Sequence, residues 1–422
     1  MSLKIASFFF ILVISSLFRA SFQAFLVPIT KDSATQKYTL PVYLRTPPRP
    51  VNLLLDLGAT FTLIDCSRNY ASSTYHSIPC GSSLCSSLGP HSCSVCSGLA
   101  GPGCSNNSCA LRFTNSGARK STVMGEALMD SMSLPVTNGR NPGPLGTIHD
   151  FIFSCTKGPF RRAHVKGASG SAGFGRSKLS VPAQVSKSFH EKLLFALCLS
   201  GSPAAPGVGF FGSPGPYYFY PEIDLSNRLT YTPLLSPQLS DEYFVGLTSI
   251  KVNGKVVRLT QHKGVLPAKI STMTPYTTLR SEIFKALAEA FVKESAAANL
   301  KSIEPVKPFG VCYDADDVAD TPAGPAVPTV DLVMQNEGAA WRIFGSNSMV
   351  RIFKGGVDAW CLGFLDGGNH PKSPPVVIGG HQMEDNLLLF DVGSKRVGFS
   401  GSVLVHGTMC ANFNFTKEET LL

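Results

Sequence analysis

The stretch LLLDLGATFTLID (residues 53–65) places a single carboxylate between two apolar runs. Short apolar runs of this kind are typical of buried β-strands, so Asp56 is expected in the loop that joins two of them. The stretch AKISTMTPYTTL (268–279) repeats the strand–loop–strand arrangement in the second half of the chain. About a hundred residues after each stretch, an apolar run ends in glycine: SGSAGFG (169–175) and VVIGG (376–380). This weak duplication favours two similar lobes with a cleft between them.

Most other segments also have the pattern of short strands, and the 39 glycines and 30 prolines supply many turns. The sequence therefore predicts a predominantly all-β, bilobal protein with a few short helices. The clearest helix is SEIFKALAEAFVKESAAANL (281–300), with Ser281 as its expected cap and apolar residues at helical spacing. A shorter helix is expected over 181–193, and RIFGSNSMVRIF (342–353) is expected to be strand.

The chain is expected to divide into three parts. Residues 1–24 have the pattern of a secretory signal peptide, because their apolar run from Phe8 to Phe18 is too short to span a bilayer. Residues 25–233 are expected to form an N-terminal lobe with a Cys-rich insertion at 66–109, and residues 234–422 a C-terminal lobe. No later segment is apolar enough to cross a membrane, so a secreted, extracellular protein without a membrane span is predicted.

Charge and spacing exclude several classes of function. The formal net charge of +9 favours acidic partners such as cell-wall polyanions. Basic residues are not clustered with aromatic ones, so nucleic-acid binding is unsupported. The nine histidines lack metal-ligand spacing, and GFFGSPGP (209–216) lacks the Lys-Ser/Thr of a phosphate loop. Neither a metal nor another cofactor is therefore expected.

Twelve cysteines fit an oxidising compartment and predict disulfide bonds. A zinc site at CSVC (93–96) is disfavoured, because no second such pair and no His-x-x-x-His set accompanies it. Nine cysteines lie in the first half and three in the second, so complete pairing requires at least one bridge between the halves. Asn106 (NNS) and Asn414 (NFT) head glycosylation sequons, which a secreted protein is expected to use. The cysteines are Cys66, Cys80, Cys85, Cys93, Cys96, Cys104, Cys109, Cys155, Cys198, Cys312, Cys361 and Cys410.

Several longer stretches make the chain similar to a known family. They are VPITKDSATQKYTLPVYL (27–44), SGSAGFGRSKLSVPAQV (169–185), PFGVCYD (308–314), GSNSMV (345–350), VVIGGHQMEDNLLLFDVGSKRVGFS (376–400) and CANFNFT (410–416). On these, the chain resembles the plant group of pepsin-fold proteins that contains TAXI-type xylanase inhibitors, extracellular dermal glycoproteins and basic 7S globulins. The resemblance implies a bilobal, pepsin-like aspartic-protease fold. It also implies the bridges Cys198–Cys410, Cys312–Cys361 and Cys66–Cys155, and leaves the pairing within 66–109 open.

The resemblance also shows which catalytic positions have changed. An aspartic protease needs two carboxylates that share a proton, so that one activates water while the other donates to the substrate. Asp56 matches the first, but Ser271 stands where the second would be. A serine hydroxyl has no useful basicity near neutral pH and cannot take the proton from water. Asp56 and Ser271 are therefore expected to be vestigial, and the protein is predicted not to be an enzyme.

Further changes around the two loops point the same way. Leu57 and Ala59 replace hydroxyl residues that brace the carboxylates in proteases of this fold, and Met273 replaces a glycine that lets the backbone approach closely. Such proteases also carry a tyrosine on a flap over the cleft. The flap is expected within residues 111–127, and no tyrosine occurs between Tyr75 and Tyr217.

The C-terminal tail implies a function. In TAXI-type inhibitors a histidine four residues before the last cysteine enters the xylanase cleft, and His406 stands four residues before Cys410. Related xyloglucanase inhibitors have arginine there and a second arginine where this chain has Pro322. The resemblance therefore implies a secreted inhibitor of microbial, endo-xylanase-like glycoside hydrolases in the apoplast, with His406 as a target-binding residue. The alternative for His406 is an exposed tail residue without a role.

Two other functions remain as alternatives. A storage or ligand-binding protein of the basic 7S globulin kind would share every motif found with the inhibitor. An atypical aspartic protease would require a carboxylate at the place of Ser271.

Overall fold

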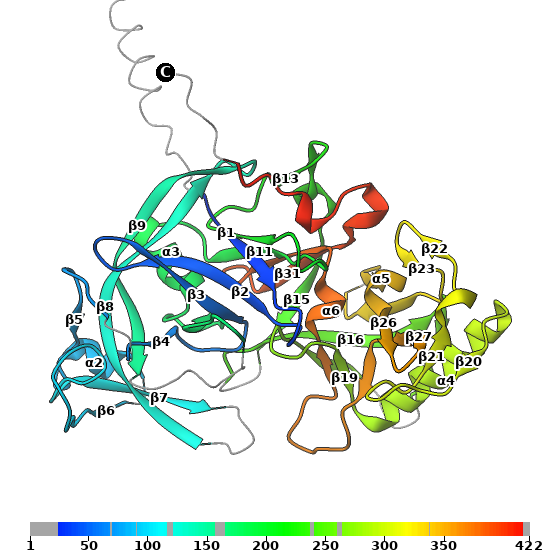
Figure 1. Cartoon of the computed structure of the whole chain (residues 1–422), viewed down its shortest axis with the longest axis horizontal. Helices are drawn as coiled ribbons and strands as arrows, with labels where there is room; N and C mark the ends of the chain where they lie inside the picture. The colour runs from blue at the N-terminus through cyan, green and yellow to red at the C-terminus, as the bar shows by residue number, and fades with distance from the viewer. Residues whose placement is uncertain are drawn as a thin grey trace, which may run out of the picture.

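The computed structural model describes residues 24–67, 70–89, 91–115, 121–156, 165–236, 240–259, 264–336 and 338–416. The expected signal peptide lies outside these ranges except for Ala24, as do residues 116–120 of the expected flap segment. The described part is mostly strand with a few short helices, and Figure 1 shows two lobes side by side. The expected bilobal, predominantly β architecture is therefore confirmed.

The two halves of the chain contribute elements in a similar way. The first half supplies β1 (Ala24–Lys31), β2 (Tyr38–Leu44), β3 (Arg49–Asp56), β4 (Leu63–Asp65), β5 (His76–Ser77), α2 (Ser83–Ser87), β6 (His91–Cys93), β7 (Cys109–Asn115), β8 (Ser121–Thr137), β9 (Pro142–Thr156), β10 (Gly170–Gly173), α3 (Val181–Phe189), β11 (Leu194–Cys198), β12 (Gly207–Phe211), β13 (Tyr218–Phe219), β14 (Ile223–Asp224), the 3₁₀ helix η1 (Leu225–Arg228) and β15 (Thr230–Leu235). The second half supplies β16 (Tyr243–Val252), β17 (Lys255–Val256), β18 (Leu266–Ile270), β19 (Thr277–Leu279), α4 (Ser281–Ala297), β20 (Ser302–Ile303), β21 (Cys312–Asp314), η2 (Ala315–Asp317), β22 (Asp320–Thr321), β23 (Gly324–Pro325), β24 (Val330–Met334), β25 (Ala340–Ile343), α5 (Gly345–Ser348), β26 (Met349–Lys354), β27 (Val357–Leu362), β28 (Phe364–Asp366), β29 (Val376–Ile378), α6 (Gly380–Met383), β30 (Asn386–Asp391), β31 (Arg396–Ser402), η3 (Val403–His406) and η4 (Cys410–Asn412).

A shared sheet joins the lobes. β30, near the end of the chain, pairs antiparallel with β11 of the first half, in a register that runs from Leu194↔Asp391 to Cys198↔Leu387. β11 in turn pairs with β12 and β12 with β1, while β31 pairs with β15. Figure 1 shows β11, β31 and β15 in the region between the lobes. The two ends of the chain are thus held in one hydrogen-bonded layer.

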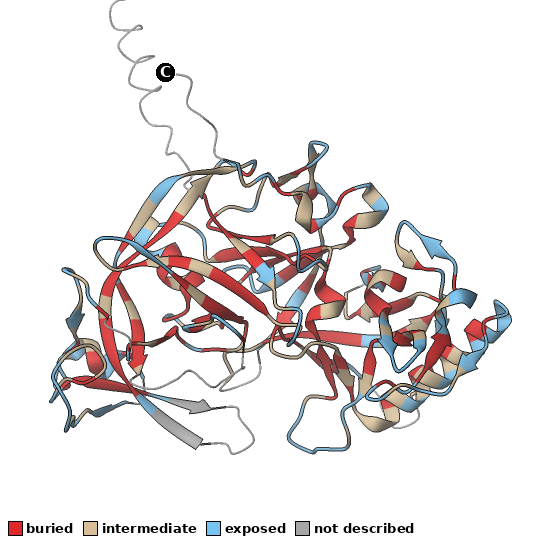
Figure 2. Cartoon of the chain, in the orientation of Figure 1, coloured by how far each residue is buried: buried red, intermediate tan, exposed pale blue. Residues whose placement is uncertain are grey.

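The core follows the strands through both lobes. Figure 2 shows buried residues along the central strands and exposed ones on the outer loops. A second apolar cluster includes Phe210 of β12, Val403 of η3 and Phe413. The Phe413 ring packs edge-on against Phe210, with ring centroids 5.3 Å apart. The C-terminal tail is therefore part of a folded core.

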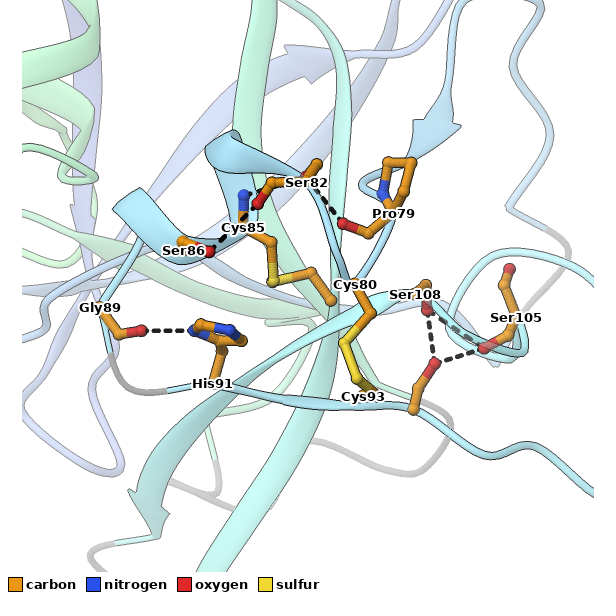
Figure 3. The surroundings of a disulfide bond; sticks show 12 residues. Pro79, Cys80, Ser82, Cys85, Ser86, Gly89, His91, Cys93, Ser105 and Ser108 are labelled. Carbon is orange, nitrogen blue, oxygen red and sulfur yellow. Dashed lines mark hydrogen bonds between the residues drawn. A yellow bond between two sulfur atoms is a disulfide. The ribbon is translucent and has the colours of Figure 1, made fainter.

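Six disulfides pair all twelve cysteines. They are Cys66–Cys155, Cys80–Cys93, Cys85–Cys109, Cys96–Cys104, Cys198–Cys410 and Cys312–Cys361. One of them joins the halves, and three are the pairs that the resemblance implies. Figure 3 shows the Cys-rich segment, where Cys80 is bonded to Cys93 and the Ser82 hydroxyl accepts from the amide of Cys85 to cap α2. Only a small apolar cluster supports this segment, so the three short-range bridges supply much of its order.

Two local expectations were wrong. α4 has Arg280 at its cap position, and the Ser281 hydroxyl instead bonds the Asp366 carboxylate at 2.6 Å. The expected strand over 342–353 is interrupted by α5. Within α5 the side-chain amide of Asn347 donates to the carbonyls of His381 and Glu384 at 2.9 and 2.7 Å. This contact fastens the GSNSMV segment to α6, more than thirty residues further along the chain.

Candidate functional site

The loop after β3 holds Asp56. β3 pairs antiparallel with β2, and its last residues pair parallel with β10 in the register Gly173↔Asp56. Asp56 is 4% exposed, and its Oδ1 accepts from the amide of Gly58 at 2.9 Å. This amide contact is of the kind expected for a carboxylate that stabilises its own loop.

The loop after β18 carries Ser271 in a matching setting. β18 pairs parallel with β29, as β3 does with β10. The Ser271 hydroxyl accepts from the amide of Met273 at 3.3 Å and from the hydroxyl of Thr274 at 3.4 Å. Met273 packs against the small apolar cluster of Leu54, in β3, and Val165. The serine is therefore engaged by its own loop, and a methionine fills space beside the first lobe.

Thr272 connects the two loops from one side. It is fully buried; its hydroxyl donates to the carbonyl of Leu55 at 2.8 Å and accepts from the amide of Leu57 at 3.3 Å. The equivalent position in the first loop is Leu57, which has no hydroxyl and is itself fully buried. The second loop is therefore bonded to the first through the Thr272 hydroxyl. The first loop has no matching hydroxyl at Leu57 that could bond the second.

Thr272→Val should lower the free energy of unfolding by about 1–3 kcal/mol, because it leaves two buried backbone groups without their hydroxyl partner at nearly constant volume. Urea unfolding measures the loss. Thr230→Val, at an exposed position of β15, is the control and should change the stability little. A stability unchanged by Thr272→Val would show that the contact contributes nothing across the lobes.

Charged side chains beside Asp56 escaped the sequence analysis. Lys269 Nζ lies 2.9 Å from Glu242 Oε1, and a Cβ added to Gly58 would meet the Glu242 side chain at 3.2 Å. Burial lowers the pKa of Lys37, and the charge of Asp56 partly opposes that shift. An ion pair and a lysine therefore lie near the first loop. Glu242 precedes β16 and Lys269 is within β18, and no local pattern singles them out.

The three acidic residues at and just after the end of PFGVCYD lie on an exposed turn. Asp314, Asp316 and Asp317 are exposed at the 3₁₀ turn η2, where Asp314 Oδ1 accepts from the amide of Asp316 at 3.0 Å. These three carboxylates therefore belong to a solvated turn.

The tail after β31 carries His406. The Asp385 carbonyl accepts from the amide of Val403 at 2.8 Å, and its carboxylate accepts from the amide of Cys410 at the same distance. Gly407, with a φ of 75°, ends η3 in the left-handed region that glycine adopts most easily. The bridge from Cys410 to Cys198 then fixes the tail to β11 covalently. His406 is thus presented between two anchored points.

His406 is half-buried in this tail. Burial lowers the pKa of its imidazole below the usual value, and the positive charge of Arg228 lowers it further. In the free protein the ring is therefore predominantly neutral near pH 7, able to accept a hydrogen bond through one nitrogen and to donate through the other.

Asp385, which accepts hydrogen bonds from the tail, should make the free energy of unfolding depend on pH. Burial raises its pKa to about 6, although the amides of Cys410 and Gly201 oppose the shift. A carboxyl with a raised pKa stabilises the fold below its unfolded pKa, and that contribution is lost as the pH rises through about 6. The expected loss is about 2.4 kcal/mol between pH 4 and pH 7.

Asp385→Asn should remove this loss, because the amide does not titrate and its oxygen can still accept from Cys410. The measurement is the difference in unfolding free energy between variant and wild type at pH 4 and at pH 7. Asp358→Asn is the control of opposite sign, because the bond to Arg351 lowers the pKa of Asp358. A difference for Asp385→Asn that is the same at both pH values would contradict the prediction.

The Pro322 position lies on the same side of the molecule as the tail. Pro322 is exposed between β22 and β23, and the amide of Ser346 in α5 donates to the carbonyl of Ala323 at 2.8 Å. Figure 1 shows the β22–β23 hairpin and the red C-terminal tail at the upper edge, and β7 and the orange segment between β28 and β29 at the lower edge.

Both sequon asparagines, Asn106 and Asn414, are exposed.

Comparison with known proteins decides the family. The family description "Xylanase inhibitor N-terminal" matches residues 38–213, and "Xylanase inhibitor C-terminal" matches residues 242–401. The chain belongs to the xylanase inhibitor family. A curated member from Nicotiana benthamiana, "Probable aspartic proteinase GIP2", is 42% identical, over 93% of this chain and 92% of that one.

Solved structures of related proteins agree with the pepsin-like fold. "Crystal structure of edgp" covers 93% of this chain and 98% of that chain at 43% identity, with a TM-score of 0.87. "Crystal structure of Basic 7S globulin from soybean" covers 94% and 100% at 31% identity, with a TM-score of 0.80. The xylanase inhibitor family therefore includes proteins named after proteinases and seed globulins.

The six bridges fit a secreted member of this family. Within the described ranges, no helix combines the length and apolarity that a membrane crossing requires. In the same ranges, no three His, Cys, Asp or Glu side chains converge in the manner of metal ligands.

Proposed function

We propose that this protein is a secreted, catalytically inactive inhibitor of microbial endo-xylanase-like glycoside hydrolases in the plant apoplast. The observation that carries the proposal is His406 on a surface tail anchored by Cys198–Cys410. An anchored loop gives up little conformational freedom on binding, which favours affinity. The family match adds a class of partner, because xylanase inhibition is the property that names it.

Inhibition works by occupying the hydrolase's substrate cleft. That cleft holds two carboxyl groups, one kept protonated by its environment and one ionised. The imidazole of His406 donates a hydrogen bond to the ionised group and accepts one from the protonated group, or takes its proton. Pro322 stands where related xyloglucanase inhibitors have a second arginine, and it carries no charge. The target is therefore of the endo-xylanase kind and not a xyloglucanase. The net charge of +9 favours the encounter with acidic clefts and with cell-wall polyanions.

The inactive pepsin-like cleft is part of the proposal. Denatured globin should show no pepstatin-sensitive cleavage between about pH 3 and pH 6, the range in which paired aspartates work. Ser271→Asp alone should not restore cleavage, because Leu57 and Met273 remain and the Glu242–Lys269 ion pair lies beside Gly58. Clear pepstatin-sensitive cleavage by the wild type would instead favour the reading that the name of the Nicotiana relative suggests.

A storage or ligand-binding role is the second candidate. Its support is the likeness to the soybean basic 7S globulin over the whole of that chain. Such a protein would bind its ligand elsewhere and need no contact from the tail.

A panel of purified fungal and bacterial xylanases and glucanases separates the two functions. The inhibitor should slow at least one endo-xylanase at stoichiometric concentration, without effect on an unrelated hydrolase. Lack of inhibition across the panel, together with stable assembly into oligomers, would favour the storage role. Use of the Asn106 and Asn414 sequons is tested on the same secreted sample, by the mass lost on enzymatic deglycosylation.

A further inference from the structure

Exposed apolar side chains lie on and beside the tail that carries His406. Of the eleven large hydrophobic side chains exposed in the described part of the chain, three belong to this surface: Val405 at 48%, Met409 at 42% and Tyr220 at 75%. Val405 and Met409 flank His406 in sequence. Tyr220 comes from a distant loop and is held beside the tail, because the Thr408 hydroxyl donates to its carbonyl at 2.6 Å. The Tyr220 amide also donates to the carbonyl of Asn412 at 3.2 Å.

The surroundings of this patch are positively charged and hollowed. Arg228 is exposed and close enough to lower the pKa of His406. On the Val405 side there is a hollow of about 280 Å³, whose walls include Phe399 and Arg342. The Arg342 guanidinium is half-exposed and held by the Asp331 carboxylate at 2.7 Å. The patch thus combines apolar contact area with two cationic groups, of which Arg342 is held by an ion pair.

We propose that Tyr220 is a second target-binding residue, which packs its ring against an aromatic wall of the hydrolase's glycan-binding cleft while His406 reaches the carboxyl groups. This inference rests on the proposed function and names a contact of that same surface. Ligand clefts are lined mainly by apolar and aromatic side chains, which gives the Tyr220 ring a complementary partner. The cationic groups around it suit the acidic centre of the same cleft.

The side chain of Tyr220 is of a type that often dominates the binding energy of an interface. Tyrosine offers a large, amphipathic contact area with only two rotatable side-chain bonds, so little entropy is lost when it is immobilised. Tyrosine is also enriched among the few residues that dominate binding energies. Met409 and Val405, on the anchored tail, enlarge the apolar area next to it, and both residue types pack without unpaired polar groups.

The test measures inhibition constants against one sensitive endo-xylanase. Tyr220→Ala should weaken inhibition about 30-fold or more, the effect of a hot-spot truncation. Tyr220→Phe keeps the ring and should stay within about threefold of the wild type, because the ring face makes the contact. The matched control is Phe353→Ala, which removes an aromatic ring that is 79% exposed on β26, and its inhibition constant should stay within about twofold.

The outcomes separate this inference from the proposed function. If His406→Ala abolishes inhibition while Tyr220→Ala inhibits like the wild type, the role of Tyr220 is overturned and the proposed function stands. If Phe353→Ala weakens inhibition as much as Tyr220→Ala, the contact is not specific to this patch and the inference is also overturned. If the wild type inhibits no hydrolase, both fail. Thermal unfolding of each variant confirms that the exposed substitutions leave the fold intact.

Discussion

His406→Ala should weaken inhibition of a sensitive endo-xylanase by roughly one and a half to three and a half decades. A buried, charge-assisted contact between an inhibitor and its target costs about 2–5 kcal/mol when it is truncated, and each 1.4 kcal/mol is a factor of ten. Folding should be unchanged, because the imidazole is half-buried at the end of a short 3₁₀ helix and lies outside the apolar core. The measurement is a titration of xylanase activity with variant and wild type, with circular dichroism as the folding control.

The pH dependence of inhibition supplies a second readout of His406. Its pKa in the free protein is lowered by burial and by Arg228, whereas carboxylates of a bound target would raise it. Binding then takes up a proton at any pH between these two values, so affinity should fall as the pH rises through that window. His406→Ala should flatten this dependence. His370→Ala is the control, since His370 is exposed on the segment between β28 and β29, away from the tail. Equal inhibition by wild type and His406→Ala would remove His406 from the site.

Local patterns were sufficient for elements whose partners lie close in the chain. The helix expected over 281–300 occurs over Ser281–Ala297, because Ile283, Leu287 and Phe291 recur at helical spacing and are all buried. The alternation of short apolar runs likewise predicted the β character of both lobes. The loops at Asp56 and Ser271 were recognisable because each follows a buried strand, at corresponding places in the two halves.

Contacts between distant segments could not be predicted in this way. The pairing of β30 with β11 joins residues almost two hundred positions apart, and neither strand has a pattern that names its neighbour. The same holds for buried Glu384, which accepts from Tyr38 at 2.5 Å and lies 2.7 Å from Lys31 Nζ. Burial alone would raise the pKa of Glu384, but bonds to His381 and Lys31 outweigh that effect and lower it. The sequence around Glu384 therefore gave no indication that its carboxylate would be buried and paired with Lys31.

The candidate site likewise contains one residue that a local stretch of sequence identified and others that only the folded structure brings to it. His406 was singled out through the resemblance of the tail to that of TAXI-type inhibitors, which is carried by the short stretch that ends at Cys410. Tyr220, Arg228 and the hollow beside Val405 come together only in the folded chain, where the turn between β13 and β14 is bonded to the tail. The signal that could have marked Tyr220 is its large ring in a Pro-rich loop, and that signal is too common to identify a binding residue by itself.

Removal of the Cys198–Cys410 bridge is the change expected to cost the most stability. The two cysteines are 212 positions apart, and closing so long a loop stabilises the folded state by about 5 kcal/mol, through the entropy that the unfolded chain loses. Both sulfurs lie in the apolar cluster that supports the tail, so a double change to alanine also removes buried volume. The paired variant Cys198→Ala with Cys410→Ala should show this loss in urea unfolding.

The matched control is the paired variant Cys96→Ala with Cys104→Ala, which opens a loop of only 8 positions in the Cys-rich insertion. It should lose about 2–3 kcal/mol and inhibit xylanase as the wild type does, because its bridge is remote from the tail in the fold. The Cys198/Cys410 variant should inhibit more weakly even at temperatures where it is fully folded. Its tail keeps the packing of Phe413 against Phe210 and the bond from the Cys410 amide to Asp385, but it loses the covalent link that fixes His406. Equal stability losses in the two paired variants would contradict the loop-length argument. Undiminished inhibition by a folded Cys198/Cys410 variant would show that packing alone holds the tail in its binding geometry.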